Sequence, residues 1–428
     1  MSDFATKGQT RGKRRGFRFL SLLWLLTGLV FTLLTSCYLA FRSIGPLLDE
    51  RYRAMFAISV VSFVAAAAIV RYVRRFALVN LWSIVIWSCL GLGVAALLVL
   101  SLSDLGYSAA YVALYYPVSV AVLAVWVLMI HKIENLKLAM IPEGLSGEVL
   151  QARHPQLVFQ VLQSPDEVHA LNGVDGIVVD VETPLSEPWL RAVGQWSAQR
   201  RRIYSASDLY ESISGRVSLM RISSGIVAGF TGNVGYQGAK RMLDILGVIT
   251  LSPIILLVMA VTAVAVKAEG RGPAIFSQQR IGLGGRSFTI YKFRSMVSGS
   301  EKDGPKFAAH RDGRVTKVGA FIRKFRIDEF PQMWNIFRGD MSLIGPRPEQ
   351  PKFVAEFNEQ IPYYSYRHQV RPGITGWAQV HQGYAADVEA TRDKLEYDLY
   401  YIKHLSFWLD ILIVFKTLRT IATGFGAR

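Results

Sequence analysis

Long uninterrupted runs of apolar residues dominate the first third of the chain. Four of these runs contain no Asp, Glu, Lys, Arg or His, and they cover residues 19–41, 54–70, 76–103 and 105–130. A helix rises about 1.5 Å per residue, so each run is long enough to cross a hydrocarbon layer of roughly 30 Å. The pattern predicts a four-helix transmembrane bundle over residues 19–131.

The charges that flank these runs predict their orientation. Residues 1–18 carry six Lys or Arg side chains, and further basic residues follow the second run (Arg71, Arg74, Arg75) and the fourth (Lys132, Lys137). Basic flanks stay on the cytoplasmic side, so both ends of the bundle are expected there. With no ionisable group inside, the bundle is expected to anchor the chain or to form a homodimer contact, and not to carry a substrate.

Residues 140–218 have the composition of a soluble domain. Residues 157–162 and 176–181 are predicted to be short buried strands, and residues 188–200 a helix with Trp189 and Trp196 on one face. Alternating strands and helices predict a small Rossmann-like α/β module. It contains no G-x-G-x-x-G loop, so a regulatory or packing role is favoured over dinucleotide binding. Residues 219–235 are the expected linker.

A fifth apolar run, residues 245–266, has basic residues on both sides. Both ends therefore favour the cytoplasmic face. Ser252 and Pro253 lie in its first half, and proline removes a backbone hydrogen bond and bends a helix. The expected element is a re-entrant helix that bends at Ser252–Pro253 and returns to the same leaflet; the alternative is a fifth spanning helix.

Composition narrows the class of partner. The 428 residues are 51% hydrophobic and carry a formal net charge of +16. This excess suits lipid head groups or phosphorylated substrates, whereas the absence of zinc or helix-turn-helix signatures argues against nucleic acid. The two cysteines, Cys37 and Cys89, lie inside apolar runs, so neither a disulfide framework nor a cysteine metal site is predicted.

The main candidate for chemistry is the stretch RKFRIDEFPQMWNIFRGDMSLIGPRPE, residues 323–349. Apolar residues at helical spacing predict a short helix that ends at Gly339, with Asp328 and Glu329 at its start and Asp328 as a cap residue. An acidic pair at a helix start is usually a cap that complements the helix dipole. Here cations surround the pair, and Arg347 stands between two prolines. Such a cluster also suits a divalent metal and a pyrophosphate.

Two smaller elements follow from local patterns. The glycines of RIGLGG, residues 280–285, precede an alternating segment at residues 287–291 and predict a hairpin turn, not a phosphate loop. Residues 405–421 predict an apolar helix that carries Asp410, Lys416 and Arg419. These charges favour a helix lying in the membrane interface over one that crosses the membrane.

The run IDEFPQMWNIFRGDMSLIGPRP resembles the signature of the bacterial polyprenyl-phosphate hexose-1-phosphate transferases. The similarity continues through Lys292-Phe293-Arg294-Ser295-Met296, residues 276–282, residues 315–319, Arg371-Pro372-Gly373-Ile374-Thr375-Gly376-Trp377 and the segment around Asp398. It covers residues 236 to 428. The resemblance implies a membrane-associated α+β catalytic domain with a re-entrant helix, preceded by the bundle and the α/β module.

The resemblance also implies an activity. Hexose 1-phosphate, with glucose or galactose preferred, would pass from a UDP-sugar to undecaprenyl phosphate at the cytoplasmic face of the bacterial inner membrane, as the first membrane step of exopolysaccharide, capsule or O-antigen synthesis. Asp328 would be the nucleophile, and Glu329 would join it in holding Mg²⁺. Phosphates would be bound by four basic residues: Lys292, Arg294, Arg347 and Arg371.

Three other classes of protein share parts of this pattern. A non-catalytic membrane scaffold of a glycan assembly complex would have the same helices but would not need the Asp328–Glu329 pair beside Arg347. A peripheral protein that binds anionic lipid would explain the charge but predicts no turnover. A sugar-nucleotide dehydratase would need a glycine-rich strand-turn-helix and a Tyr-x-x-x-Lys pair, and the sequence has neither at the expected places.

Overall fold

The computed structural model describes residues 23–73, 81–102, 108–131, 137–143, 158–167, 174, 176–219, 234–297, 313–382 and 387–423. The basic segment 1–18 and nearly all of the expected linker lie outside these ranges. The chain divides into two compact units, Met1–Ala206 and Ser207–Arg428, each with buried apolar clusters of its own.

The predicted apolar helices are confirmed. They are the helix Leu23–Phe41, α2 (Arg53–Val73), α3 (Leu81–Leu102) and α4 (Ala109–His131), with the short turns η1 (Gly45–Leu48) and η2 (Glu50–Tyr52) after the first. Some polar atoms inside them are paired, whereas the buried Ser36 hydroxyl and Trp126 Nε1 have no hydrogen-bond partner among the described residues. The Tyr115 hydroxyl donates to Ser59 O at 2.8 Å, and Tyr116 bonds the Ser62 hydroxyl at 3.2 Å. Among the described residues, five helices in all are long and apolar enough to cross a membrane.

The α/β module contains a four-stranded parallel sheet in the order β2-β1-β3-β4. Its strands are β1 (Lys137–Met140), β2 (Val158–Val161), β3 (Gly176–Val179) and β4 (Ile203–Ser205). Helix α6 (Glu187–Ala198) packs Trp189 and Trp196 against the sheet. The two predicted strands and the helix are confirmed, while β1 and β4 were not predicted.

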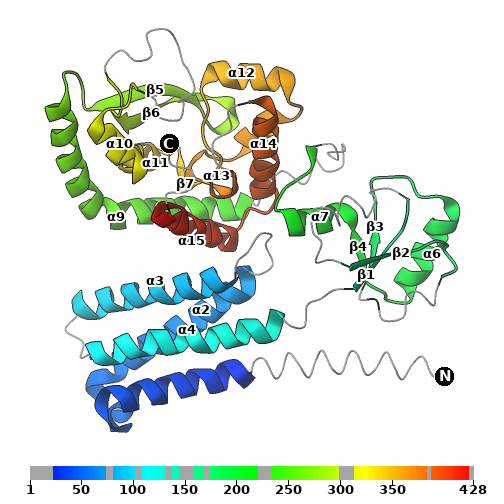
Figure 1. The fold of residues 1–428 in the computed structure, drawn as a ribbon, viewed down its shortest axis with the longest axis horizontal. Coiled ribbons are helices and arrows are strands. Elements are labelled where there is room, and N and C mark those ends of the chain that lie inside the picture. Colours follow the sequence, from blue (N-terminus) through cyan, green and yellow to red (C-terminus); the bar gives the residue numbers. More distant parts are fainter. Residues whose placement is uncertain are drawn as a thin grey trace. The chain divides into compact units, whose positions relative to one another are not determined.

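The second unit begins with α7 (Ala206–Ser214) and the long helix α9 (Val234–Glu269), which bends along its course (Figure 1). The antiparallel hairpin β5 (Ile275–Ile281) and β6 (Ser287–Phe293) follows, as predicted. Its turn, η6 (Leu283–Gly285), places Gly284 and Gly285 at positive φ, which glycine adopts without strain. Helix α10 (Lys317–Lys324) is capped by the Thr316 hydroxyl, which accepts from Gly319 N at 3.0 Å.

The remaining elements complete the second unit. In chain order they are η7 (Ile327–Gln332), α11 (Met333–Arg338), β7 (Ser342–Ile344), α12 (Pro351–Gln360), η8 (Tyr364–Gln369), β8 (Gly373–Thr375), α13 (Trp377–His381), α14 (Val388–Lys403) and α15 (Phe407–Thr423). One core cluster joins α9, β6 and α11 through Val248, Ile290 and Ile336. A second joins α9, β6 and α10 through Val266, Phe293 and Ile322. The two clusters thereby fix strand β6 of the hairpin against α9, α10 and α11.

Ser252 and Pro253 act together inside α9. Proline at position 253 cannot donate to the carbonyl of Ile249, four residues earlier. The Ser252 hydroxyl supplies a replacement, because it donates to Ile249 O at 2.7 Å. The pair therefore allows a bend without leaving a carbonyl unsatisfied in apolar surroundings.

Candidate active site

The acidic pair lies in η7, the 3₁₀ turn that leads into α11. The acids were predicted to lie at the start of the helix with Asp328 as its cap, and that prediction is wrong. Arg326 holds the position before the turn, in a left-handed conformation with φ of 55°, and no side chain caps α11. Pro331 lies near the end of this 3₁₀ turn, just before α11 begins at Met333. The helix ends at Gly339, as predicted, with φ of 96°.

Glu329 is the centre of a buried cation cluster. Its side chain is 5% exposed, and its Oε1 accepts from Arg347 Nη2 at 2.8 Å. Lys292 Nζ lies 3.6 Å from the same oxygen. The structure therefore brings Lys292, Glu329 and Arg347 together from three separate stretches of sequence. Asp328 is half-buried beside them, with no hydrogen bond or ion pair to any described residue.

Lys292 reaches this cluster because α11 holds strand β6 in place. The fully buried side chain of Asn335 accepts from Tyr291 N at 3.2 Å and donates to Thr289 O at 2.7 Å. One amide thus satisfies a strand N–H and a strand carbonyl, as a neighbouring strand would. Asn335 belongs to the helix that directly follows the acids, so Lys292 and Glu329 are set in register.

A second buried network of hydrogen bonds holds the backbone of Arg347. Arg367, 3% exposed, donates from Nη2 to Arg347 O at 2.9 Å and to Asp398 Oδ2 at 2.8 Å. Its Nη1 donates to the Tyr364 hydroxyl at 2.7 Å. A buried guanidinium is stable only when it is paired and hydrogen-bonded in this way. Asp398 thereby fixes the backbone of Arg347 through Arg367.

The turn before Arg347 requires glycine. A Cβ on Gly345 would lie 2.3 Å from Arg371 O, because β7 and β8 approach closely there. Gly345 N donates to Thr375 O at 2.8 Å, and Gly373 N donates to Pro346 O at 2.9 Å. The Gly-Pro-Arg-Pro segment is therefore fixed on both sides before its guanidinium reaches Glu329.

Glu349, which directly follows the Gly-Pro-Arg-Pro segment, forms ion pairs with two cations. It accepts from Lys394 Nζ at 2.5 Å, and Arg280 Nη1 lies 3.5 Å from its other oxygen. Arg280 also donates to Pro348 O at 3.1 Å. Burial opposes ionisation of Glu349, but the cations Lys394, Arg367 and Arg280 outweigh it and lower its pKa to about 2.

The pKa values of Asp328 and Glu329 are shifted in opposite directions. Burial, followed by the neighbouring Glu329 charge, raises the pKa of Asp328 to about 6. Burial alone would also raise the pKa of Glu329, but Arg347 and Lys292 lower it to about 2. Burial and the Arg347 charge lower the pKa of Lys292 to about 8. At neutral pH, Glu329 is a permanent anion, while Asp328 and Lys292 are each close to a change of charge.

The donor set allows Mg²⁺ only with help from a substrate. Among the described residues, no group of three or more His, Cys, Asp or Glu side chains could hold a metal. Glu329 Oε2 is nevertheless buried without a hydrogen-bond partner. Mg²⁺ commonly binds one or two carboxylates together with substrate phosphates and water. Asp328 and Glu329 fit that pattern.

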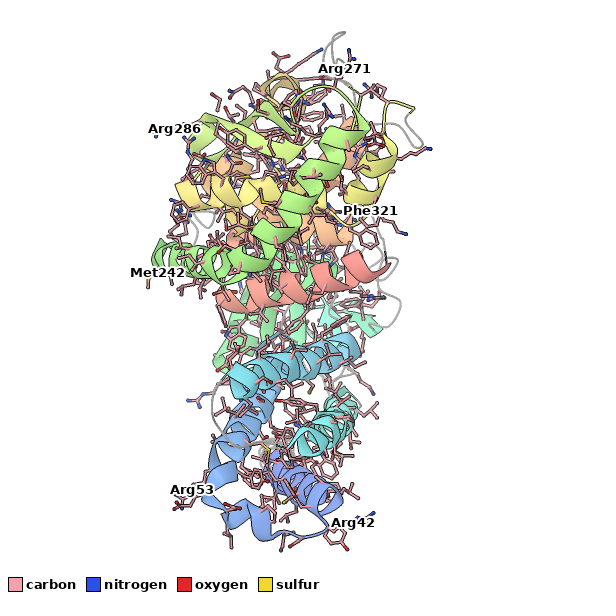
Figure 2. The ribbon with its side chains drawn as sticks, turned by 90° about the vertical axis from the view of Figure 1, so that its left-hand side faces the viewer. Arg42, Arg53, Met242, Arg271, Arg286 and Phe321 are labelled. Atoms are coloured by element: carbon pink, nitrogen blue, oxygen red, sulfur yellow. The ribbon has the colours of Figure 1, made fainter. Side chains whose placement is uncertain are left out.

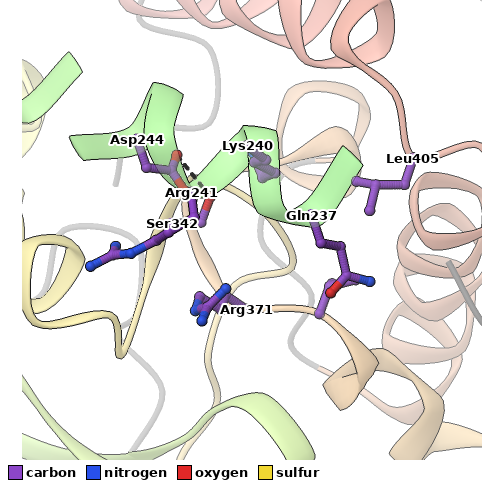
Figure 3. A pocket seen from close by; sticks show the side chains of 8 residues that line it. Gln237, Lys240, Arg241, Asp244, Ser342, Arg371 and Leu405 are labelled. Carbon is purple, nitrogen blue, oxygen red and sulfur yellow. Dashed lines mark hydrogen bonds between the residues drawn. The ribbon is translucent and has the colours of Figure 1, made fainter. Parts of the chain in front are cut away.

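The other predicted phosphate-binding residues lie elsewhere in the second unit. Arg294 bonds three carbonyls at the end of α9 and just after it, those of Val266, Gly270 and Arg271, at 2.7 to 2.8 Å. Arg371 donates from Nε to Gly339 O at 3.0 Å and lines a hollow at the C-terminal end of α11 (Figure 3). No described contact joins either residue to Glu329.

Several organising residues were not assigned from the sequence. Asn335, Arg367, Glu349 and Lys394 hold the cluster without being part of it. One sequence feature could have indicated them: charged residues that lie within apolar or aromatic runs. Arg367 follows three tyrosines, and Asp398 lies in Tyr397-Asp398-Leu399-Tyr400-Tyr401. Buried charges of this kind need partners, but the sequence does not say which ones.

Comparison with known proteins decides the family. Residues 235–424 match the model of the family described as bacterial sugar transferase. Over 314 residues, 72% of this chain and 73% of the relative, the chain is 45% identical to the UDP-N-acetylgalactosamine-undecaprenyl-phosphate N-acetylgalactosaminephosphotransferase of Aeromonas hydrophila. The chain belongs to the bacterial sugar transferase family.

Two further bacterial sugar transferases match a shorter part of this chain. The UDP-glucose:undecaprenyl-phosphate glucose-1-phosphate transferase of Caulobacter vibrioides is 43% identical over 188 residues, 43% of this chain and 70% of that protein. The uncharacterized sugar transferase EpsL of Bacillus subtilis is 37% identical over 187 residues, 44% of this chain and 89% of that protein. The Bacillus protein is thus matched over most of its length by less than half of this chain.

Proposed function

We propose that this chain transfers a sugar 1-phosphate from a UDP-sugar to undecaprenyl phosphate and releases UMP. One observation carries the proposal: two adjacent carboxylates in different electrostatic states lie beside fixed cations. Glu329 is paired with Arg347 and Lys292, and Asp328 is left without a partner among the described residues. A carboxylate held in ion pairs suits the binding of charged groups, whereas a carboxylate without a partner can act as a nucleophile.

The first step is attack by Asp328 on the β-phosphorus of the UDP-sugar. A bond forms between a carboxylate oxygen and that phosphorus, and the bond from phosphorus to the bridging oxygen breaks, so that UMP leaves with the electron pair. The product is a sugar phosphate joined to Asp328 as an acyl phosphate. A pKa near 6 leaves Asp328 mainly ionised at neutral pH and more basic than an ordinary carboxylate.

The surrounding cations stabilise the charge on the phosphoryl oxygens. Arg347 uses one nitrogen for Glu329, and its planar group has further donors for a phosphate. Lys292 supplies a second positive charge from strand β6. Asp328 and Glu329 would hold Mg²⁺, which when bound neutralises phosphate charge and helps orient the pyrophosphate.

In the second step, a phosphate oxygen of undecaprenyl phosphate attacks the same phosphorus. The bond to Asp328 breaks, the carboxylate is regenerated, and the sugar is left on a lipid diphosphate. Because the acceptor is a lipid, the site must lie close to a membrane surface. The exposed apolar side chains of the second unit fit this requirement, since α9, α10 and α11 expose Ile254, Phe321 and Trp334.

We infer that α9 re-enters the same leaflet, and the contacts near its two ends support this. Near the start, Asp244 accepts from Leu343 N at 3.1 Å, and at the end, Glu269 accepts from Val318 N at 2.9 Å. Both partners belong to the same folded unit, and a helix that crossed a bilayer would have ends some 30 Å apart on opposite faces. The bend of α9 brings both ends to this unit (Figure 2). Its exposed residues between Ile249 and Val264 would lie in the cytoplasmic leaflet.

The Aeromonas relative bears on the choice of sugar. Its name gives N-acetylgalactosamine, and its match covers 314 residues, more than the catalytic family region alone can supply. The named glucose transferases match over 183 to 188 residues. UDP-N-acetylgalactosamine is therefore our first candidate donor, and the glucose or galactose expected from the sequence comes second.

The test is UMP release by the purified full chain in nanodiscs that contain undecaprenyl phosphate and Mg²⁺. UDP-N-acetylgalactosamine, UDP-N-acetylglucosamine, UDP-galactose and UDP-glucose are compared one by one. We expect one donor to dominate, and Asp328→Asn to abolish release. Asp208→Asn, an isosteric change on a side chain that is 74% exposed, is the control and should retain activity.

The scaffold alternative predicts a different outcome. A scaffold would fold and bind membranes normally but would release no UMP with any donor. If the wild type is inert with all four sugars, or if Asp328→Asn releases UMP at the wild-type rate, the proposed function is wrong.

A further inference from the structure

Residues 211–219 follow the α/β module along the chain and bind to α13 and α14 of the second unit. Glu211, with a side chain that is 5% exposed, forms an ion pair with Lys403 Nζ at 2.8 Å. Gly215 O accepts from the buried Trp377 Nε1 at 2.8 Å. The first half of this segment is therefore fixed to the second unit, although the proposed reaction uses none of its residues.

The backbone of the second half is bound by one residue of α14. Val217 N donates to Glu396 O, and Leu219 N donates to Glu396 Oε1, both at 3.1 Å. An irregular segment has no neighbouring strand or helical turn to accept its N–H groups. Here a helix carbonyl and a helix carboxylate accept them instead.

Arg216 adds side-chain contacts to the same part of α14. Its Nη1 lies 3.2 Å from Asp393 Oδ2 and 4.0 Å from Glu396 Oε2. Its guanidinium carbon lies 4.4 Å from the centre of the Tyr397 ring. The Arg216 side chain is only 22% exposed, so water and salt screen these charges less than those of a surface pair. The cation–π contact adds to the attraction.

The same turns of α14 also support the segment that carries Arg347. Lys394 Nζ forms an ion pair with Glu349. Asp398 forms an ion pair with Arg367, which in turn donates to Arg347 O. The helix is therefore the only layer between residues 211–219 and the network that holds the Arg347 backbone along this chain of contacts.

Helix geometry makes the two sets of contacts interdependent. Residues three and four apart lie on the same face of a helix, and successive residues are about 100° apart around its axis. One face of α14 consists of Asp393, Glu396 and Tyr397, and the neighbouring face of Lys394 and Asp398. A rotation of these turns that loosened the first face would displace Asp398, and the backbone of Arg347 would move with it.

We propose that Arg216 is a positioning residue for the transferase reaction. By holding one face of α14, it fixes the place of Asp398, which holds the backbone of Arg347 through Arg367. No described contact joins Arg216 to either acid of the site, so its effect passes through the helix. The inference rests on the proposed function, because it needs a reaction that Arg347 assists.

Steady-state UMP release by the full chain in nanodiscs tests the proposal. Arg216→Gln should lower kcat about tenfold, because a small displacement of a group that stabilises developing charge removes much of its effect. Arg216→Lys keeps the charge beside Asp393 and should recover most of this loss. Arg191→Gln removes an arginine from an ion pair on α6 that is 72% exposed, and this matched control should keep the wild-type kcat. Circular dichroism melts establish that each variant is folded.

A double-mutant cycle distinguishes positioning of Arg347 from a general loss of stability. In an Arg347→Lys chain, the group that Arg216 positions is already replaced. Arg216→Gln should then lower kcat by less than about twofold further, whereas independent effects of the two changes would multiply.

Three results would overturn the proposal. Equal kcat values for Arg216→Gln and Arg191→Gln would mean that residues 211–219 only pack against α14. A loss of the same factor in the Arg347→Lys chain would mean that Arg216 does not act through Arg347. Both results leave the transferase reaction intact. A wild type that is inert with every donor would overturn the proposed function, and this inference with it.

Discussion

At the scale of single residues, the site depends on the different pKa values of its two adjacent acids, Asp328 and Glu329. Arg347 and Lys292 hold Glu329 in its charged form, and the Glu329 charge and burial raise the pKa of Asp328. A sequence can show that two acids are adjacent, but not which of them the cations reach. The assignment of Asp328 as nucleophile came from the family resemblance, whereas the structure supplies a physical reason for it.

The pH dependence of UMP release follows from these groups. Below about pH 6, Asp328 takes up a proton and loses its nucleophilic lone pair, so the rate should fall about tenfold per pH unit. Above about pH 8, Lys292 loses its charge, and the rate should fall again. Lys292→Arg keeps the charge and should move only the upper limb to higher pH. A profile that is flat from pH 5 to pH 8 would contradict this account.

Arg347 gives a second prediction at this scale. Arg347→Lys should lower kcat by about 10² to 10³, because lysine cannot bond Glu329 and a phosphate with one planar group. Steady-state kinetics with the preferred donor measure the effect, and Arg338→Lys on the surface of α11 serves as control. An Arg347→Lys enzyme with kcat within about threefold of the wild type would show that charge alone suffices.

At the scale of elements, the long helices and the hairpin could be predicted, but the 3₁₀ turns could not. Apolar runs and alternating patterns are long enough to specify α9, β6 and α15. The turn η7 spans only six residues, and Glu329 inside it is buried against residues that are distant in sequence. The partners of Arg367 and Asn335 are distant in sequence, so no local pattern reveals them.

The topology of α9 is the prediction that belongs to this scale. In a chain whose two cysteines are replaced by Ala, Gly238→Cys and Arg271→Cys should both react with a membrane-impermeant maleimide from the cytoplasmic face only. Gly238 has open space around its Cα, so the change should not disturb the fold. Asp49→Cys, between the first two helices, should react only from the opposite face. Labelling of positions 238 and 271 from different faces would establish a spanning helix.

At the scale of the whole molecule, the proposed chemistry belongs to the second unit, whose helix α9 would also hold it in the membrane. All the site residues lie in Ser207–Arg428, and the Bacillus relative EpsL is matched over 89% of its length by only 187 residues of this chain. A chain that starts at Ser207 should therefore release UMP with a kcat within about threefold of the full chain. Assays in matched nanodiscs, with circular dichroism to confirm folding, measure this. A folded but inert fragment would mean that the first unit takes part in catalysis.

The most direct test of the central claim is the mass of the peptide that contains Asp328. The full chain is mixed with the preferred UDP-sugar and Mg²⁺ without undecaprenyl phosphate, quenched in acid and digested. We predict that this peptide gains the mass of one sugar phosphate, that the gain disappears when undecaprenyl phosphate is added, and that Asp328→Asn shows none. If UMP is released only when the lipid is present and Asp328 is never modified, the transfer is direct and the covalent mechanism is wrong.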